Sequence, residues 1–210
     1  MYTPAYFKAD DPAQLAAMMR RHSFATLVTS GERGLFATHV PFLYDAEPGP
    51  HGVLLTHLAR ANPQWQEFAA GREVMVIFQG EHGYISPSWY VSAGPSVPTW
   101  NYEAVHAHGV PRILEEARAA DLLLRTVAHY ERPGSGYAVP PDFLQKSVKA
   151  IVALEIPVAR LEGKFKLSQN RSAEDVQAAI HGLEDGGEPA ALRLAAAIRR
   201  ANGLSQTSGM

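Results

Sequence analysis

Short apolar and β-branched runs, separated by turn residues, dominate the first half of the chain and constrain it to form a sheet. The run from Glu73 to Gln79 is dense in β-branched residues, as expected for a strand buried on both faces. The strands predicted in this half are 24–29, 35–44, 53–57, 73–79 and 97–110, with 84–86 pairing nearby. Because closure removes unpaired sheet edges, many short strands predict a closed antiparallel barrel.

Helical patterns interrupt and follow these strands. Asp11 and Pro12 suit the N-cap and first position of a helix, and Ser172 opens a capping box. The other predicted helical segments are a short helix from 62, then 114–130, 140–148, 173–182 and 189–201, and the final strands are 151–156 and 164–168. The predicted fold class is α+β, mainly β, with peripheral helices. We expect a barrel over 1–170, a helical segment packed on it over 171–202, and a flexible tail over 203–210.

Composition excludes several functional classes. The chain has no cysteine, so disulfides, thiolate metal sites and cysteine nucleophiles are excluded. A formal net charge of -2 gives no basic field to hold a nucleic acid, so DNA as a partner would need a local patch, a dimer groove or another protein. No apolar run approaches the roughly 20 residues that cross a bilayer, and the first residues lack a secretory signal. We therefore expect a cytoplasmic protein without membrane contact.

The stretch from Thr56 to Trp65 is the strongest local candidate for a binding site. A strand ends in a short loop that opens into a helix, whose first amide groups lack internal acceptors and can bind an anion. His57 and Arg60 would add charge-assisted donors at the same point. The alternative is that Asn62 caps the helix, Pro63 begins it, and Arg60 is a solvated surface residue.

Two other segments concentrate candidate binding residues. Lys164, Lys166 and Ser168 share one face of a predicted strand, although lysines also protect edge strands from aggregation. The segments 83–90 and 98–102 are rich in aromatic side chains, which suit a planar ligand, a partner subunit or a plain barrel core.

Histidine is frequent, but the patterns of familiar metal and hydrolase sites are missing from the sequence. His106 and His108 would lie on one strand face, yet there is no His-Glu-x-x-His motif and no cysteine, so no metal is predicted. The Gly-x-Ser-x-Gly elbow is also missing. The helix pair 173–182 and 189–201 has an acidic junction that would repel phosphate, which disfavours a helix-turn-helix.

Taken in order, these segments resemble the PaiB family of FMN-binding negative transcriptional regulators. The matching pieces are 1–4 with Phe7, 23–29, 37–42, 57–65, 76–80, 84–90, 97–102 and 164–170. The resemblance covers roughly residues 1 to 200, and several blocks in the right order are more specific than any one of them.

The resemblance implies an antiparallel FMN-binding split β-barrel in which two subunits of a homodimer enclose two cofactor sites. In that fold the phosphate end of FMN would lie at His57, Arg60 and Asn62, and the strands beside the ring would carry Thr26, Thr38, His39 and Pro41. Lys164, Ser168 and Gln169 would approach the ring edge, where a lysine stabilises negative charge on the reduced ring. Trp100 and Asn101 would come from the second subunit.

The resemblance also implies a repressor of other genes, in which the redox state or occupancy of FMN alters the dimer. An alternative is an FMN-dependent oxidoreductase of the NAD(P)H:flavin or pyridoxamine-phosphate-oxidase type, although no Gly-x-Gly-x-x-Gly motif is present. A third hypothesis is a haem-handling relative with His39, His106 or His129 as ligand. We assign no catalytic residue.

Overall fold

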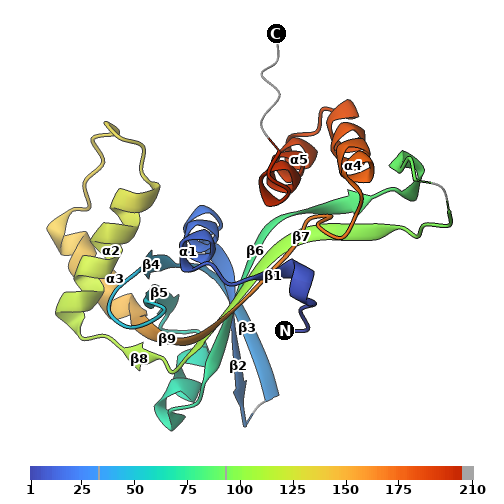
Figure 1. Ribbon diagram of the computed structural model, residues 1–210. Helices are drawn as coiled ribbons and strands as arrows, with labels where there is room; N and C mark the ends of the chain where they lie inside the picture. The colour runs from blue at the N-terminus through green and yellow to red at the C-terminus, as the bar shows by residue number, and fades with distance from the viewer. Residues whose placement is uncertain (33, 93, 205–210) are drawn as a thin grey trace. The chain divides into compact units, whose positions relative to one another are not determined.

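The computed structural model describes residues 1–32, 34–92 and 94–204, and it contains an antiparallel sheet with helices between and after the strands (Figure 1). The strands are β1 Lys8–Ala9, β2 Phe24–Gly31, β3 Gly34–Pro41, β4 Leu43–Asp45, β5 Val53–Ala59, β6 Val74–Ile85, β7 Thr99–Gly109, β8 Arg112–Ile113 and β9 Ile151–Lys166. The α-helices are α1 Pro12–Arg21, α2 Glu116–Tyr130, α3 Pro141–Ala150, α4 Ala173–Asp185 and α5 Pro189–Ala201, and the 3-10 helices are η1 Ala5–Phe7, η2 Pro63–Ala70 and η3 Pro87–Trp89. None of the helices in the described ranges is long and apolar enough to cross a bilayer.

The sheet path runs β3-β2-β6-β7-β9-β5-β4, and β1 and β8 also pair with β9. β9 is the longest described strand and pairs antiparallel with β5 from Pro157 opposite Val53 to Ile151 opposite Ala59. The predicted strands and helices are therefore present, but some boundaries differ. The strand predicted over 35–44 is divided at Phe42 into β3 and β4. Residues 84 and 85 continue β6, and residues 151–166 form one strand where two were predicted.

The prediction of a closed barrel is wrong, because the sheet is not closed. The path ends at β3 and β4, and no ladder joins these two strands over the residues that the structure describes. Pro41 ends β3 and has no amide hydrogen to donate to a ladder. Its carbonyl accepts the Thr56 hydroxyl at 2.7 Å, and the Phe42 amide donates to the Ser23 carbonyl at 2.8 Å. These bonds fix a corner between β3 and β4 where a closed barrel would need continuous pairing.

The chain groups into two compact units. The terminal unit consists of Met1–Met18, Gln79–Val105 and the residues from Glu162 onward, and the central unit consists of Met19–Phe78 and His106–Leu161. β6, β7 and β9 contribute residues to both units. The predicted division between residues 170 and 171 stays a prediction, and the predicted tail lies outside the described residues from 205 onward.

In the central unit, alternation along the strands places one face of the sheet in the core. β2 buries Ala25, Leu27 and Thr29, as expected where side chains point alternately to opposite faces. α2 and α3 cover a second apolar cluster on β4, β5 and β9. That cluster consists of Leu43, Val53, Leu55, Ala119, Leu122, Val148 and Ala153.

In the terminal unit, α4 and α5 form a helical hairpin beside the outer part of β6 and β7 (Figure 1). The Ser172 hydroxyl accepts the Asp175 amide at 3.2 Å, so Ser172 caps α4 as its sequence predicts. The Asp175 carboxylate in turn accepts the backbone amides of Val91 and Ser92, each at 3.0 Å, and the Ser92 hydroxyl. The bonds from Ser92 lower the pKa of the Asp175 carboxyl. The capped start of α4 thus ties the helical hairpin to the segment that links β6 to β7.

Candidate functional site

The loop between β5 and η2 is ordered by Asn62. The Asn62 Oδ1 atom accepts the Gln64 amide at 3.0 Å, and its Nδ2 donates to the Thr38 hydroxyl oxygen at 3.0 Å. Pro63 occupies the first helical position and has no amide hydrogen. The predicted cap is therefore formed, and it satisfies one of the amides that the sequence offered for anion binding.

Gln64 is a buried structural link that the sequence analysis did not single out. Its side chain is 1% exposed, and Nε2 donates to the carbonyls of Leu27 at 3.1 Å and Phe36 at 3.2 Å. A weaker contact of 3.4 Å reaches the Thr29 hydroxyl. Oε1 is buried and has no partner among the described residues. One amide therefore joins η2 to β2 and β3, and its position directly after the capping residue and proline was the only signal in the sequence.

Arg60 binds main-chain carbonyls at the end of α3. Its Nε donates to the Lys149 carbonyl at 2.8 Å, Nη2 donates to the Ile151 carbonyl at 2.6 Å, and its amide donates to the Ala150 carbonyl at 2.8 Å. The last carbonyls of a helix lack intrahelical partners, so a cation suits this position. Arg60 can hold a phosphate only with the donors that remain, and its phosphate contact stays a prediction.

His57 lies on β5 and is partly buried. Burial lowers the pKa of its imidazole below the ordinary value of 6.5. The side chain is therefore predominantly neutral at pH 7, and it supplies a hydrogen bond rather than a positive charge to any ligand beside it.

The β2–β3 hairpin separates the predicted ring contacts onto two faces. Thr26 lies directly opposite His39, and Phe24 lies opposite Pro41, so these four residues share one face. Thr38 lies opposite Leu27 on the other face, where its hydroxyl oxygen accepts a hydrogen bond from the Asn62 side-chain Nδ2. Of the four predicted strand residues, the structure thus places Thr26, His39 and Pro41 together and Thr38 apart from them.

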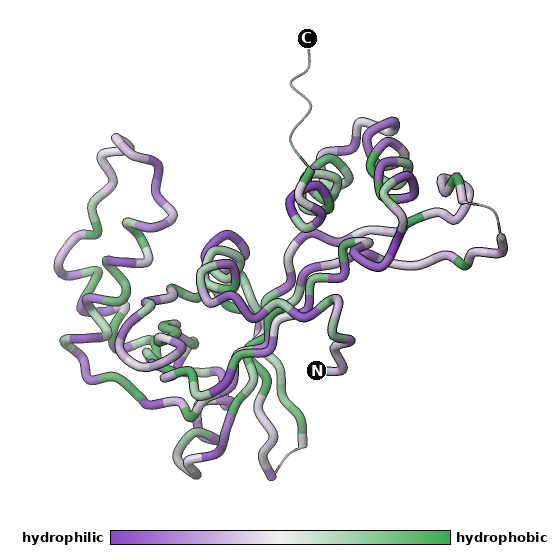
Figure 2. Tube along the Cα trace, in the orientation of Figure 1, coloured by the Kyte–Doolittle hydropathy of each residue, from purple (hydrophilic) through white to green (hydrophobic). Residues whose placement is uncertain are grey.

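We call the first of these faces the outer face. It comprises Phe24, Thr26, Val28 and Ser30 of β2 with Leu35, Ala37, His39 and Pro41 of β3. Phe24 is 65% exposed and Leu35 is 80% exposed. The rings of Phe24 and His39 are nearly parallel, with an interplanar angle of 28° and centroids 6.5 Å apart. Figure 2 shows the hairpin mostly green or near white, with purple at its tip. This face is a flat, largely apolar surface with exposed rings.

In the terminal unit, Asn101 and Ser168 form a buried polar pair. Asn101 is 1% exposed, and its Nδ2 donates to the Ser168 hydroxyl oxygen at 2.7 Å. Ser168 has a φ of 67°, a left-handed conformation that is uncommon outside glycine. The Gln169 side chain accepts the Leu167 amide at 2.7 Å and donates to the Phe165 carbonyl at 2.6 Å. Gln169 therefore stabilises the turn that holds Ser168.

Lys164 and Trp100 lie among aromatic residues of the same unit. The Lys164 ammonium donates to the Tyr2 carbonyl at 3.1 Å and lies 5.6 Å and 5.3 Å from the ring centroids of Tyr2 and Tyr102. Trp100 is 55% exposed and packs edge-to-face with Tyr84, the centroids being 6.4 Å apart. The predicted ring-edge residues thus occupy one unit, and the predicted phosphate residues occupy the other.

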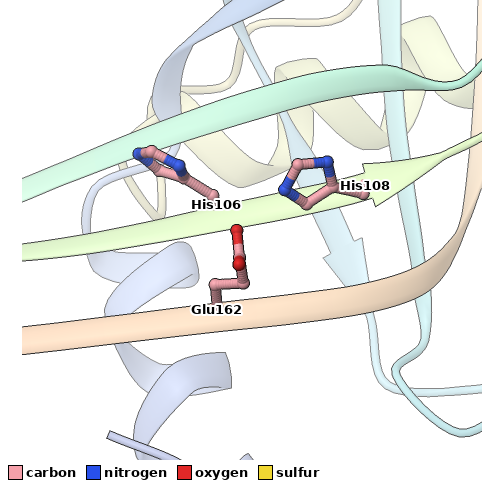
Figure 3. A group of neighbouring side chains, drawn as sticks. All are labelled: His106, His108 and Glu162. Carbon is pink, nitrogen blue, oxygen red and sulfur yellow. The ribbon is translucent and has the colours of Figure 1, made fainter. Parts of the chain in front are cut away.

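The histidines proposed as metal or haem ligands lie on different elements. His106 and His108 project from β7 (Figure 3), and the His108 Nδ1 lies 3.5 Å from a Glu73 carboxylate oxygen. His129 lies on α2 and packs edge-to-face with Tyr130, with centroids 4.7 Å apart. Figure 3 also labels Glu162, which belongs to the terminal unit whereas both histidines belong to the central unit. The absence of a metal site stays a prediction.

Comparison with protein families gives a match over most of the chain. The family described as "Putative FMN-binding domain" matches residues 1–160. The protease synthase and sporulation protein PAI 2 of Bacillus subtilis is 36% identical over 199 residues, which cover 93% of this chain and 95% of that protein. An uncharacterized protein of Saccharomyces cerevisiae, YKL070W, is 37% identical over 87 residues, which cover 40% of this chain and 51% of that protein.

Solved flavoprotein structures share the fold at low sequence identity. The flavocytochrome Anf3 of Azotobacter vinelandii superimposes with a TM-score of 0.57 at 14% identity, covering 78% of this chain and 72% of that chain. The FAD and heme binding protein of Mycobacterium smegmatis gives a TM-score of 0.55 at 14% identity, covering 82% and 79%. The fold of this chain is therefore the antiparallel split β-barrel of flavoproteins.

We predict that His57 makes stability depend on pH. Its folded-state pKa is lowered, so the unfolded chain binds more protons once the pH falls below about 6.5. The contribution of neutral, buried His57 to stability is complete above that pH and decreases as the pH falls below it. Replacement by His57→Gln should therefore flatten the decrease in the free energy of unfolding between about pH 7 and pH 5, measured by urea denaturation. Equal slopes for the variant and the native protein would show that His57 is not the group responsible.

Proposed function

Since the chain belongs to the PaiB family of FMN-binding proteins, we propose that it acts as a homodimeric, flavin-dependent negative regulator of transcription. FMN is its cofactor. The observation that carries the regulatory proposal is the match to PAI 2 over nearly the whole length of both chains. In this proposal, the redox state or occupancy of FMN changes the dimer and thereby its effect on transcription.

The outer face of the central unit suits the flavin ring. A flavin is a flat aromatic system with polar edges, and the exposed, nearly parallel rings of Phe24 and His39 offer a flat surface for stacking. Thr26 adds a hydroxyl directly opposite His39. FMN itself supplies reversible electron transfer at its ring.

The terminal unit suits the polar edge of a flavin. The Lys164 ammonium lies between two tyrosine rings, and Asn101 and Ser168 form a buried donor and acceptor pair. A lysine near the ring edge stabilises negative charge on the reduced cofactor. We therefore propose that the flavin lies near Lys164, Ser168, Asn101, Trp100 and Gln169. Gln169 contributes by stabilising the turn that holds Ser168.

We propose that a second copy of the chain covers the outer face. Apolar side chains gathered on an exposed sheet face mark an interaction surface, and Phe24, Leu35 and Ala37 give this face that character. A self-complementary patch around a two-fold axis is the commonest way to form a homodimer. Covering this face would also enclose a flavin stacked on Phe24 and His39.

The dimer is tested by placing a charge on this surface, at the hairpin end where Leu35 is 80% exposed. Leu35→Asp should convert the dimer to a monomer, because an unpaired carboxylate in an apolar interface is costly to desolvate. The mass is measured by size-exclusion chromatography with light scattering. Leu192→Asp on α5, also at an exposed leucine, is the matched control and should leave the dimer intact. A native protein that is monomeric at micromolar concentration, or a Leu35→Asp variant that remains dimeric, would contradict the proposed interface.

The regulatory role is tested by titrating the purified protein against its own promoter DNA at several salt concentrations. A scrambled DNA of equal length is the control, because nonspecific affinity falls with salt for both. We expect binding to depend on sequence and to change when FMN is removed or reduced. Binding without sequence dependence at low salt would end the direct-repressor proposal. Rapid, repeated bleaching of the flavin by NADH or NADPH would favour an oxidoreductase instead.

A further inference from the structure

A small cavity in the terminal unit has a lining unlike that of the other cavities described. It has a volume of about 250 Å³ and is lined by Tyr6, Phe7, Tyr90, Val97, Thr99, Asn101, Lys166, Ser168, Asn170 and Arg171. Sites for whole drug-sized ligands span about 300–1,000 Å³. The cavity is therefore suited to one group of a larger ligand, or to a small ion.

Its lining contains two cations and no carboxylate. Lys166 and Arg171 both line the cavity, and the other lining side chains are neutral. The three other cavities described, of about 370, 510 and 460 Å³, each include at least one acidic residue beside their cations. In two of them the Arg125 guanidinium is already paired with Asp45 at 2.7 Å. Among the described cavities, this one alone has a purely cationic set of charges.

The two cations keep donors for a ligand. The Lys166 ammonium donates to the Thr99 hydroxyl oxygen and, at 2.9 Å, to the Trp100 carbonyl, which leaves one of its three hydrogens. The Arg171 guanidinium lies 4.4 Å from the centroid of the Tyr90 ring, and its Nη2 donates to the Ser96 hydroxyl at 3.4 Å. Four of its five N–H donors take no part in that bond. Both side chains are therefore held in place, and each keeps at least one N–H group that can donate to a ligand.

Two hydroxyls in the lining are oriented as donors by their neighbours. Thr99 accepts from Lys166, and Ser168 accepts from the buried Asn101 amide, so each hydroxyl keeps its own proton to donate. Ser168 is 4% exposed and is held at a φ of 67°. A strained backbone conformation in a non-glycine residue is commonly found at ligand sites. The cavity therefore presents donors from both charged and neutral side chains.

Repulsion between the cations favours an anion at this place. The pKa of the Lys166 ammonium is lowered, first by burial and then by the positive charges of Lys164 and Arg171. The Asp175 carboxylate interacts with Arg171, but it is already bound by Val91 and Ser92. A bound dianion would offset this repulsion.

We propose that this cavity binds a phosphate group. A phosphate monoester carries nearly two negative charges and three acceptor oxygens, which match two cations and two hydroxyl donors better than a single carboxylate does. The phosphate can belong to FMN, in which case the proposal rests on the proposed function and assigns Asn101 and Ser168 to the phosphate instead of the ring edge, or to a free phosphorylated ligand. The sequence predicted the FMN phosphate beside Arg60, but the Arg60 side chain already binds two carbonyls at the end of α3.

Binding is tested first with inorganic phosphate on the flavin-free full chain. Backbone amide signals in the NMR spectrum should shift for residues 99–101 and 166–171, with saturation at millimolar phosphate. Lys166→Gln and Arg171→Gln should each weaken this binding about tenfold, as expected for the loss of one charge-assisted contact. Arg193→Gln is the matched control, because it removes an exposed cation of the same unit that pairs with Glu81 outside the cavity.

The source of the phosphate is tested by comparing FMN with riboflavin, which lacks it. If the cavity holds the FMN phosphate, Lys166→Gln should raise the Kd for FMN about tenfold and that for riboflavin by less than about twofold. If Arg60→Ala discriminates between the two flavins instead, and phosphate still shifts the cavity signals in FMN-saturated protein, the cavity serves a separate phosphorylated ligand. Either result supports a phosphate site.

The proposal is overturned if the native protein shows no shift of these signals at tens of millimolar phosphate. It is also overturned if both variants, with native circular dichroism and Tm, bind phosphate and FMN as the native protein does. The titration of the native protein decides the matter even if a variant does not fold. Failure of the promoter experiment would leave these outcomes unchanged, so the two proposals fail separately.

Discussion

The buried amide of Gln64 fixes the relation between η2 and the β2–β3 hairpin, on which the candidate flavin surface is built. Its Nε2 donates to a carbonyl of each strand, and its own amide is capped by Asn62, which also reaches Thr38. All of these bonds lie on the inner side of the hairpin. Because a buried donor without an acceptor costs about 1–3 kcal/mol, the arrangement is tightly specified. It leaves the outer face, with Phe24 and His39, free for a ligand and a partner.

The edge of the open sheet at β3 carries the surface on which the flavin proposal rests. The sheet path ends at β3, and the apolar outer face of β2 and β3 is exposed. Charge is distributed differently in the two units: acids and arginines pair around the central unit's cavities, whereas the described lining of the terminal unit's cavity holds Lys166 and Arg171 and no acid. An apolar surface for a ring and a cationic pocket for a phosphate are the features on which the two proposals rest.

The sequence predicted the helix caps, which depend on residues close together in the chain. The caps at Asp11, Asn62 and Ser172 form as expected, because each acts on an amide no more than three residues away. The bonds of Gln64 to Leu27 and of Arg60 to Lys149 span 37 and 89 residues, and no local pattern encodes them. The sequence allowed two interpretations of Arg60, as a hydrogen-bond donor to a phosphate or as a solvated surface residue. The structure adds its bonds to the Lys149 and Ile151 carbonyls, which neither interpretation included. Closure was predicted wrongly because alternation identifies strands but not which strand pairs at each edge.

In the proposed homodimer each chain binds one FMN, and the second copy covers the surface on which the flavin stacks. Native mass spectrometry measures the number of chains and the number of bound FMN molecules in one species. Freshly purified protein is supplied with excess FMN and then exchanged into volatile buffer. We expect a species of two chains carrying two FMN molecules. A single chain without flavin, at concentrations well above micromolar, would contradict it.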